Sequence, residues 1–319
     1  MKFFRQILLI VMLAGLWSDH SIAISAADLP PATTASTFPL TLTDGAGRLV
    51  KISAAPHRII SLSPAATDIL VKVGANTELV GVTRYCDNPG LVESRLKRLG
   101  GVLDPDYEGI VALKPNLVVM PLLADKSMQD KLTTLGLNFV VLHPEGLAGV
   151  LADIRMIGLA SGHNNQGAQT LKNFEVIQLL AKAATQAIPP EKRPRVLIRM
   201  GDVSPAPGSY VDDLLTAAGG RNVLPKGARA WVTVSLESIL QLNPDLIVDI
   251  RLPEASANPV ARDPKLPAEF RVITLNDGKP FYRPGPDLGD ALIQLTQALY
   301  PDRFTLTPNP IPAAKPPSN

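Results

Sequence analysis

The chain has 319 residues, of which 46% are hydrophobic and 19% are charged, a composition that can fill one large core or two of ordinary size. A formal net charge of +2 gives no electrostatic reason to expect nucleic acid or an acidic membrane surface as a partner. The single cysteine, Cys86, excludes an internal disulfide. A lone cysteine is usually an inert small hydrophobe, so we assign it no functional role.

Residues 1–27 are predicted to be a signal peptide. Lys2 and Arg5 precede a continuous apolar run, residues 7–17, and small residues follow it. That run is shorter than the ~20 residues that a membrane-spanning helix needs, although an uncleaved anchor is the alternative. Cleavage is expected after one of three alanines: Ala23, Ala26 or Ala27. No cysteine follows the run to carry a lipid, so we expect an unlipidated periplasmic protein.

A first α/β lobe is predicted over residues 38–162, after a Pro/Thr/Ala linker at 28–37. Two short strands, 40–43 and 48–52, flank the Gly-rich turn "DGAG" and indicate a hairpin. A buried strand then leads through a Ser-Pro turn into a helix that ends near Gly74. Further strands at "LVGVT", "LVVM" and "NFVVL" alternate with helices at 107–114 and around "SMQDKLTTLG". This alternation is typical of a parallel sheet covered by helices.

A long helix is predicted between two lobes, within residues 163–188. Its apolar residues recur every three positions, at Leu171, Phe174, Ile177 and Leu180. Two prolines end it, giving about 22 residues or roughly 33 Å. A second α/β lobe follows at 189–304, with strands at "RVLIRM", "DLIVDI" and "FRVITL". The Pro-rich tail, 305–319, is expected to be disordered.

The two lobes repeat a short unit. "DYEGIVALKPNLVVM" (106–120) aligns without a gap on "SLESILQLNPDLIVD" (235–249), an offset of 129 that places Glu108 on Glu237. "TDILVKVGA" also resembles "VDDLLTAAGG", at an offset of 145. The two offsets differ by 16, so the first lobe carries about 16 more residues between the matching segments, Arg84, Tyr85 and Cys86 among them.

Each repeat predicts a helix, a proline turn and a buried strand. Asp106 and Ser235 are suitable N-caps, which places Glu108 and Glu237 in the first helical turns. An acid there interacts favourably with the helix dipole by about 0.3–1 kcal/mol, which would explain either glutamate alone. Their duplication also fits a two-point docking surface for a basic partner.

The quoted unit, together with "RIISLSPAATDILVKVGANTELVGVTRYCDNP", resembles the cobalamin and ferric-siderophore branch of the periplasmic binding proteins. The resemblance covers about residues 40–304. It implies two Rossmann-like lobes with parallel central sheets, joined by one long α-helix. It also implies a monomeric receptor that delivers a metal chelate to an ABC importer, needs no cofactor, and docks Glu108 and Glu237 on arginines of the inner-membrane permease dimer.

The resemblance places the ligand between the lobes, on loops that follow strands, as open α/β sheets generally do. The predicted ligand-binding residues are Ser63, Arg84, Tyr85, Met120, Arg199, Trp231, Arg251, Tyr282 and Arg283. Tyr85 and Trp231 match the family's aromatic contacts, and flat rings suit a macrocycle or chelate. The alternative for Trp231 is a core position.

Convergence of two or more of the four arginines would favour an acidic ferric siderophore over cobalamin; otherwise they are solvated loop charges. Val102 lies where cobalamin receptors carry a tryptophan, and haem receptors use a tyrosine at about that place, so both ligands rank lower. The three histidines beyond residue 27, His57, His143 and His163, are too dispersed for a zinc or manganese site. No direct metal site is predicted, although a free-metal or oxyanion receptor of the same fold stays an alternative.

Two other classes of protein compete with this prediction. An enzyme is disfavoured because "SLSPAATD" lacks the glycines of a nucleophile elbow and no Gly-rich phosphate loop occurs. A binding protein that signals instead of feeding a transporter would have the same lobes. The pair of glutamates distinguishes a transport receptor from a signalling protein, because only a transport receptor needs both glutamates for uptake.

Overall fold

The computed structural model describes residues 37–121, 126–227, 229–252, 266 and 268–305. Contacts divide the chain into residues 1–33 and one compact unit, 34–319, to which everything described here belongs. The predicted signal peptide and nearly all of the linker and tail lie outside the described residues. Within the described ranges, no helix is both long and apolar enough to cross a bilayer.

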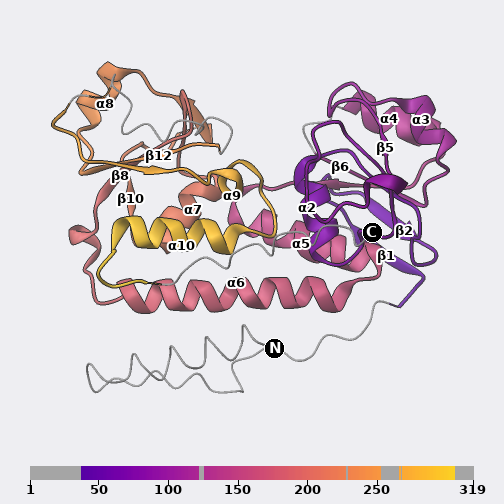
Figure 1. Cartoon of the computed structure of the whole chain (residues 1–319), viewed down its shortest axis with the longest axis horizontal. Coiled ribbons are helices and arrows are strands. Elements are labelled where there is room, and N and C mark those ends of the chain that lie inside the picture. Colours follow the sequence, from indigo (N-terminus) through magenta and orange to yellow (C-terminus); the bar gives the residue numbers. More distant parts are fainter. Residues whose placement is uncertain (1–36, 122–125, 228, 253–265, 267, 306–319) are drawn as a thin grey trace, which may run out of the picture. The chain divides into compact units, whose positions relative to one another are not determined.

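The N-terminal lobe, drawn in purple on the right of Figure 1, is built on a five-stranded parallel sheet. The order of its strands is β5-β4-β3-β6-β7. Its strands are β3 (Ile59–Ser61), β4 (Leu79–Val82), β5 (Lys97–Arg98), β6 (Leu117–Pro121) and β7 (Phe139–Leu142). The predicted hairpin precedes it as β1 (Leu40–Thr43) and β2 (Leu49–Ile52). Helical segments of this lobe are α2 (Pro64–Lys72), η2 (Glu93–Arg95), α3 (Tyr107–Ala112) and α4 (Lys126–Thr134).

The C-terminal lobe has a four-stranded parallel sheet, β10-β8-β12-β13, and a separate antiparallel pair, β9 and β11. The strands are β8 (Arg195–Arg199), β9 (Val203–Pro205), β10 (Arg221–Asn222), β11 (Trp231–Thr233), β12 (Leu246–Ile250) and β13 (Val272–Leu275). Helical segments are η3 (Pro190–Lys192), α7 (Tyr210–Ala217), α8 (Leu236–Leu242), α9 (Lys279–Tyr282) and α10 (Leu288–Leu299).

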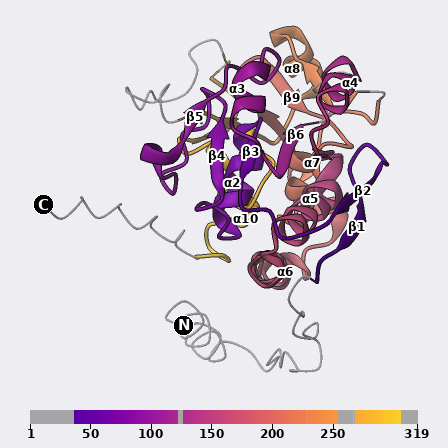
Figure 2. The same cartoon turned by 90° about the vertical axis from the view of Figure 1, so that its right-hand side faces the viewer.

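The predicted connector is α6 (Asn164–Thr185), a single helix of 22 residues. It lies side by side with α5 (Gly146–Ser161), as Figures 1 and 2 both show. The two helices approach closely where Gly158 faces Gly167. A Cβ on Gly158 would lie only 3.2 Å from the Gly167 Cα, so glycine permits this close approach. α5 was not predicted from the sequence. It is apolar nearly all round because neighbours cover most of its surface, so it lacks the polar face that reveals an amphipathic helix.

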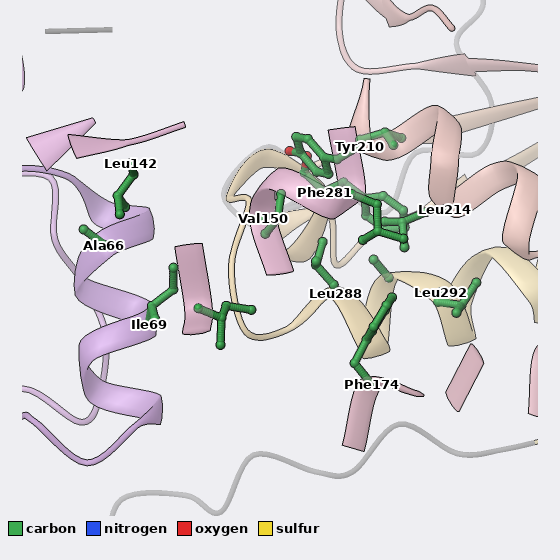
Figure 3. Packing of buried hydrophobic residues seen from close by; sticks show 14 of the residues in the cluster. Ala66, Ile69, Leu142, Val150, Phe174, Tyr210, Leu214, Phe281, Leu288 and Leu292 are labelled. Carbon is green, nitrogen blue, oxygen red and sulfur yellow. The ribbon is translucent and has the colours of Figure 1, made fainter. Parts of the chain in front are cut away.

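One hydrophobic cluster joins helices of both lobes. Ile69 of α2, Val150 of α5, Phe174 of α6, Leu214 of α7 and Leu292 of α10 all belong to it (Figure 3). Two smaller clusters lie on the other faces of the sheets, one with α3 and α4 and one with α8. Because α5, α6, α7 and α10 share this core, we expect the lobes to close by only a small movement.

The internal repeat has the same geometry in both lobes. β6 pairs with β3 and β12 pairs with β8, each time in parallel, so the repeated strand lies beside the strand that comes first in the sequence of its parallel sheet. Asp106 accepts the Gly109 N–H at 2.8 Å, and Ser235 accepts the Ser238 N–H at 3.2 Å, so the predicted N-caps are confirmed.

The residue before each repeated proline is left-handed, with φ 48° at Lys114 and 43° at Asn243. Among the described residues these are the two positive-φ positions that are not glycine. The extra residues of the first lobe include β5, the additional edge strand. The predicted fold class, two parallel-sheet α/β lobes joined by one long helix, is confirmed.

Candidate functional site: a cavity between the lobes

A cavity of about 1150 Å³ lies between the two lobes. The N-terminal lobe lines it with loops after its strands and with the start of α5. The C-terminal lobe contributes the start of α7, β11, and α9 with the loop that follows it. Such a volume holds a drug-sized or larger ligand. A smaller cavity of about 600 Å³ lies wholly within the C-terminal lobe, beside α8.

Four of the nine predicted ligand-binding residues line the larger cavity. They are Ser63, Trp231, Tyr282 and Arg283. Ser63 is the N-cap of α2, where its Oγ accepts the Ala66 N–H at 3.0 Å. The structure therefore brings residues 63 and 231–283, far apart in the sequence, to one site.

Three predicted residues, which lie at or just after the carboxyl ends of strands, miss the cavity by one position. Met120, Arg199 and Arg251 are not among the lining residues, but Pro121, Met200 and Leu252 are. Successive side chains of a strand point to opposite faces, so an error of one residue changes the environment completely. Met120 is 0% exposed and packs in the hydrophobic cluster beneath α3 and α4.

Arg199 and Arg251 both lie near the carboxylate of Asp249 and not in the cavity lining. Arg199 Nη1 lies 3.9 Å from Asp249 Oδ1, and Arg251 Nη2 lies 2.7 Å from Asp249 Oδ2. Asp249 is buried in β12, directly opposite Arg199 in the sheet register. These two arginines therefore neutralise a buried charge within the C-terminal sheet.

Arg84 and Tyr85 also lie outside the cavity lining. Arg84 Nη2 is 2.6 Å from Asp104 Oδ2, and its guanidinium lies 5.4 Å from the centroid of the Tyr85 ring. Both side chains are exposed. Val102, two residues from Asp104, does line the cavity.

Aromatic rings form the C-lobe wall of the cavity. Trp231 is 39% exposed, and its ring lies 5.8 Å from that of Tyr210, tilted by 59°. The buried Tyr210 hydroxyl donates to the Phe281 carbonyl, and burial raises the pKa of Tyr210. Tyr282 is partly exposed, and burial followed by the charge of Asp249 raises its pKa as well. All three rings are thus neutral, flat surfaces at neutral pH.

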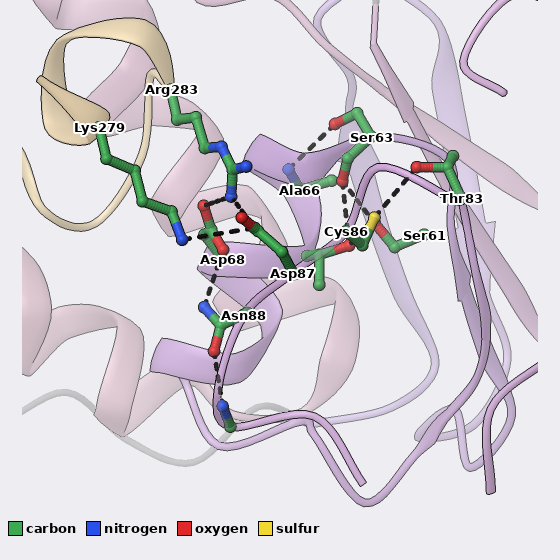
Figure 4. Close-up of polar contacts among 12 residues, drawn as sticks. Ser61, Ser63, Ala66, Asp68, Thr83, Cys86, Asp87, Asn88, Lys279 and Arg283 are labelled. Atoms are coloured by element: carbon green, nitrogen blue, oxygen red, sulfur yellow. Dashed lines mark hydrogen bonds and ion pairs between the residues drawn. The ribbon is translucent and has the colours of Figure 1, made fainter. Parts of the chain in front are cut away.

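A cluster of ionic side chains bridges the lobes at the cavity (Figure 4). Arg283 Nη1 lies 2.5 Å from Asp87 Oδ1 and 3.4 Å from Asp68 Oδ2, while Lys279 Nζ lies 3.3 Å from Asp87. Burial raises the pKa of Asp68 despite opposing hydrogen bonds from Asn88 and Arg283. Burial also acts to raise the pKa of Asp87, but Arg283 and Lys279 outweigh it and lower the pKa overall.

A histidine and two acids occupy the N-lobe side of the cavity: His143, Glu145 and Asp153. His143 Nδ1 lies 3.1 Å from the Gly45 carbonyl, and its Nε2 lies 3.5 Å from Glu145 Oε2. In the neutral tautomer that donates from Nδ1 to the Gly45 carbonyl, Nε2 carries the lone pair, which is the arrangement that metal-binding histidines adopt. Asp153 accepts the His143 backbone N–H at 3.1 Å, and burial raises its pKa to about 7.

The N-terminus of α5 is capped from the other lobe. Glu145 makes no side-chain cap, and the Leu147 N–H donates to Asp213 Oδ2 of α7 at 2.7 Å. Asp213 is the repeat partner of Asp68, so corresponding acids of the two lobes both make contacts across the lobe boundary. These contacts fix the two sides of the cavity relative to each other.

In the part of the chain that the structure describes, no group of three or more His, Cys, Asp or Glu side chains is placed to hold a metal ion. His143 lines the cavity, and its imidazole is suited to coordinate a metal that the ligand carries. Cys86 is buried and lies 3.1 Å from the hydroxyls of both Thr67 and Thr83.

Glu108 and Glu237 lie away from the cavity, exposed on α3 and α8. The hydrogen bond from its own backbone N–H, followed by one from Ser235, lowers the pKa of Glu237. Neither carboxylate forms an ion pair with a side chain of the described ranges. Each of the two carboxylates is therefore exposed on its helix without a charged side-chain partner in the described ranges.

Comparison with known proteins shows the family. A family model described as "Periplasmic binding protein" matches residues 59–257. The chain therefore belongs to the periplasmic binding protein family. It is 27% identical over 292 residues to an uncharacterised ABC transporter substrate-binding lipoprotein, YvrC, of Bacillus subtilis, covering 84% of this chain and 87% of that protein.

Two further similarities have named ligands. The chain is 31% identical over 207 residues to the vitamin B12-binding protein of Salmonella choleraesuis, covering 62% of this chain and 74% of the relative. Among solved structures, the molybdate-bound periplasmic protein MolA of Haemophilus influenzae superposes with a TM-score of 0.71 at 21% identity, covering 83% and 92% of the two chains. At that identity the likeness shows the fold.

Several cavity residues were not predicted from the sequence: Asp87, His143, Asp153, Tyr210 and Lys279. His143 directly follows the buried strand β7, so the rule that selected the other candidates also applied to it. Asp87 lies in the predicted loop, two residues after Tyr85. Asp153 and Tyr210 lie within helices, where no local signal distinguishes a cavity position from a core position.

Proposed function

We propose that this ABC-importer substrate-binding protein binds a metal chelate of macrocycle size in the cavity between its lobes. The carrying observation is the 1150 Å³ cavity, one side of which is a wall of Trp231, Tyr210 and Tyr282. Rings bury a large apolar area with little loss of side-chain entropy, as a flat or bulky chelate requires. The similarity to a vitamin B12-binding protein supports the same ligand class.

Cobalamin is the ligand that these features support best. An acidic ferric siderophore would need at least two arginines that converge on the cavity, and Arg283 alone of the four lines it. Lys279 lies beside it, but both cations already pair with Asp87. A neutral or weakly charged chelate leaves these pairs intact, whereas a polyanion must compete for them.

Haem is the second candidate, and His143 favours it. Its Nε2 lone pair is suited to an axial position on a ligand-borne iron, while Nδ1 is oriented by the Gly45 carbonyl. The haem propionates would then compete with Asp87 for Lys279 and Arg283, as the carboxylates of a siderophore would. A histidine ligand gives haem a spectroscopic signature that cobalamin and siderophores lack.

Tryptophan fluorescence tests the ligand assignment. Trp17 and Trp231 are the two tryptophans of the sequence, so a chain that begins at Asp28 reports on Trp231 alone. We expect saturable quenching by cobalamin at one equivalent, after correction for ligand absorption, and no response from ferric siderophores. If ligands leave the fluorescence unchanged, calorimetry still measures binding, because it does not depend on the tryptophan. Calorimetry of the Trp231→Phe variant then shows how much the indole ring contributes to binding. No binding of any chelate by either method would refute the proposal.

A spectroscopic arm of the same titration distinguishes haem. A shift of the Soret band that His143→Ala abolishes, and that the exposed control His57→Ala retains, would replace cobalamin by haem as the ligand. If added haem keeps the Soret band of free haem while cobalamin binds in a separate titration, haem is excluded as the ligand.

We also propose that Glu108 and Glu237 dock on arginines of a membrane permease with two halves. Support comes from their exposure and from their matching places in the internal repeat. The double variant Glu108→Ala, Glu237→Ala is expected to bind ligand normally but to lower uptake into cells. Normal uptake by this variant would contradict docking and would favour a binding protein with a signalling role.

A further inference from the structure

An exposed apolar side chain follows each docking glutamate by three residues. Val111, three residues after Glu108, is 42% exposed, and Leu240, three residues after Glu237, is 46% exposed. Residues three apart on a helix share a face, so each acid lies next to an apolar side chain. The offset of 129 that relates the glutamates also relates Val111 to Leu240.

A buried isoleucine fixes this face outward in both helices. Ile110 is fully buried in the cluster beneath α3, and Ile239 is buried in the cluster beneath α8. The segments "EGIV" and "ESIL" therefore share one pattern, in which the acid points out, the isoleucine points in and the next residue points out. The outward apolar position is thus a repeated feature of the two lobes.

Among the described residues, most of the large hydrophobic side chains that are exposed lie in one of two places. Four of them line the ligand cavity: Val203, Trp231, Leu252 and Tyr282. Three others lie on the glutamate helices: Val111, Leu236 and Leu240. The first group has a ligand to cover it, while the second lies outside the cavity. Exposed apolar surface beside a charged group is typical of a protein interface.

We propose that Val111 and Leu240, together with Leu236, form the apolar half of the docking surface, and that its occupant is a permease with two equivalent halves. This inference rests on the proposed docking role of Glu108 and Glu237. Each permease half would present a cation to one glutamate and an apolar side chain beside it. A partner with two equivalent halves fits because the acid–apolar pair occurs once on each lobe in the same sequence register.

The two parts of the surface have different roles. The glutamates attract the basic partner over a distance, so they govern association and its dependence on salt. The apolar side chains act only at contact, where removal from water slows dissociation. Truncation of both apolar residues is therefore expected to weaken binding without changing the salt dependence.

The test measures binding of the secreted chain to its importer complex, purified from the same host and reconstituted in lipid nanodiscs. Val111→Ser plus Leu240→Ser is expected to raise Kd about tenfold, mostly through faster dissociation. Glu108→Ala plus Glu237→Ala is expected to raise Kd and to flatten its salt dependence. Leu49→Ser plus Leu179→Ser is the matched control, because these side chains are 78% and 49% exposed on β2 and α6.

The outcomes separate this inference from the docking proposal itself. If the apolar variant binds like the wild type while the glutamate variant is weakened, the apolar role is refuted and the docking role stands. If neither variant is weakened, both are refuted. If the control loses affinity as much as the apolar variant does, the effect is not specific to these helices and the inference is also overturned. Circular dichroism of each variant verifies that it is folded.

Discussion

Asp153 is expected to make the stability of this protein depend on pH between 4 and 7. It is 4% exposed in α5, and burial raises its pKa from 3.8 to about 7, although the His143 N–H opposes this effect. The folded state therefore holds a proton on Asp153 more tightly than the unfolded state does. The resulting stabilisation is complete below pH 3.8 and is lost as the pH rises towards 7.

The size of the effect follows from these two pKa values. A rise from 3.8 to about 7 corresponds to about 4 kcal/mol of unfolding free energy over the whole range. Between pH 5 and pH 8 the loss is about 2.5 kcal/mol. Asp153→Asn removes the titration and keeps an oxygen that can accept the His143 N–H. The wild type should therefore lose about 2.5 kcal/mol more unfolding free energy than the variant does when the pH is raised from 5 to 8.

Urea unfolding of the chain that begins at Asp28, carried out at pH 5 and pH 8, measures this difference. The comparison of the variant with the wild type cancels the contributions that both proteins share. Asp130→Asn on α4 is the control, because Asp130 is exposed, and it should follow the wild type at both pH values. The same pH dependence in Asp153→Asn and wild type would show that Asp153 is ionised at little cost, and would refute the reasoning.

Two further variants probe the contacts between the lobes. Arg283→Ala removes a cation from the buried Asp68 and from Asp87, and should lower the unfolding free energy by about 2 kcal/mol in urea at pH 7; unchanged stability would mean that hydration replaces the arginine. Asp213→Ala removes the acceptor of the Leu147 N–H and should cost about 1 kcal/mol, with faster hydrogen exchange at that amide. Unchanged exchange would show that the start of α5 does not depend on the opposite lobe.

The sequence by itself determined the elements whose signals are local. The repeated unit predicted α3 and α8, their caps at Asp106 and Ser235 and the strands β6 and β12, all of which the structure contains. Caps, proline stops and hydrophobic periodicity act over a few residues, so they can be read without tertiary contacts. α5 was missed because packing on several sides removes the polar face by which a helix is recognised. The short elements β9, β11 and α9 were not predicted either.

The tertiary structure alone decided which side chains meet in the cavity. Met120 and Pro121 differ by one position, yet the first is in the core and the second lines the cavity, because strand direction and sheet packing set which face is covered. Arg283 meets Asp87 across 196 residues of chain, a pairing that no local pattern encodes. Interactions between residues near in sequence thus specified the repeated units, and the packing of the lobes on α5 and α6 specified the site between the lobes.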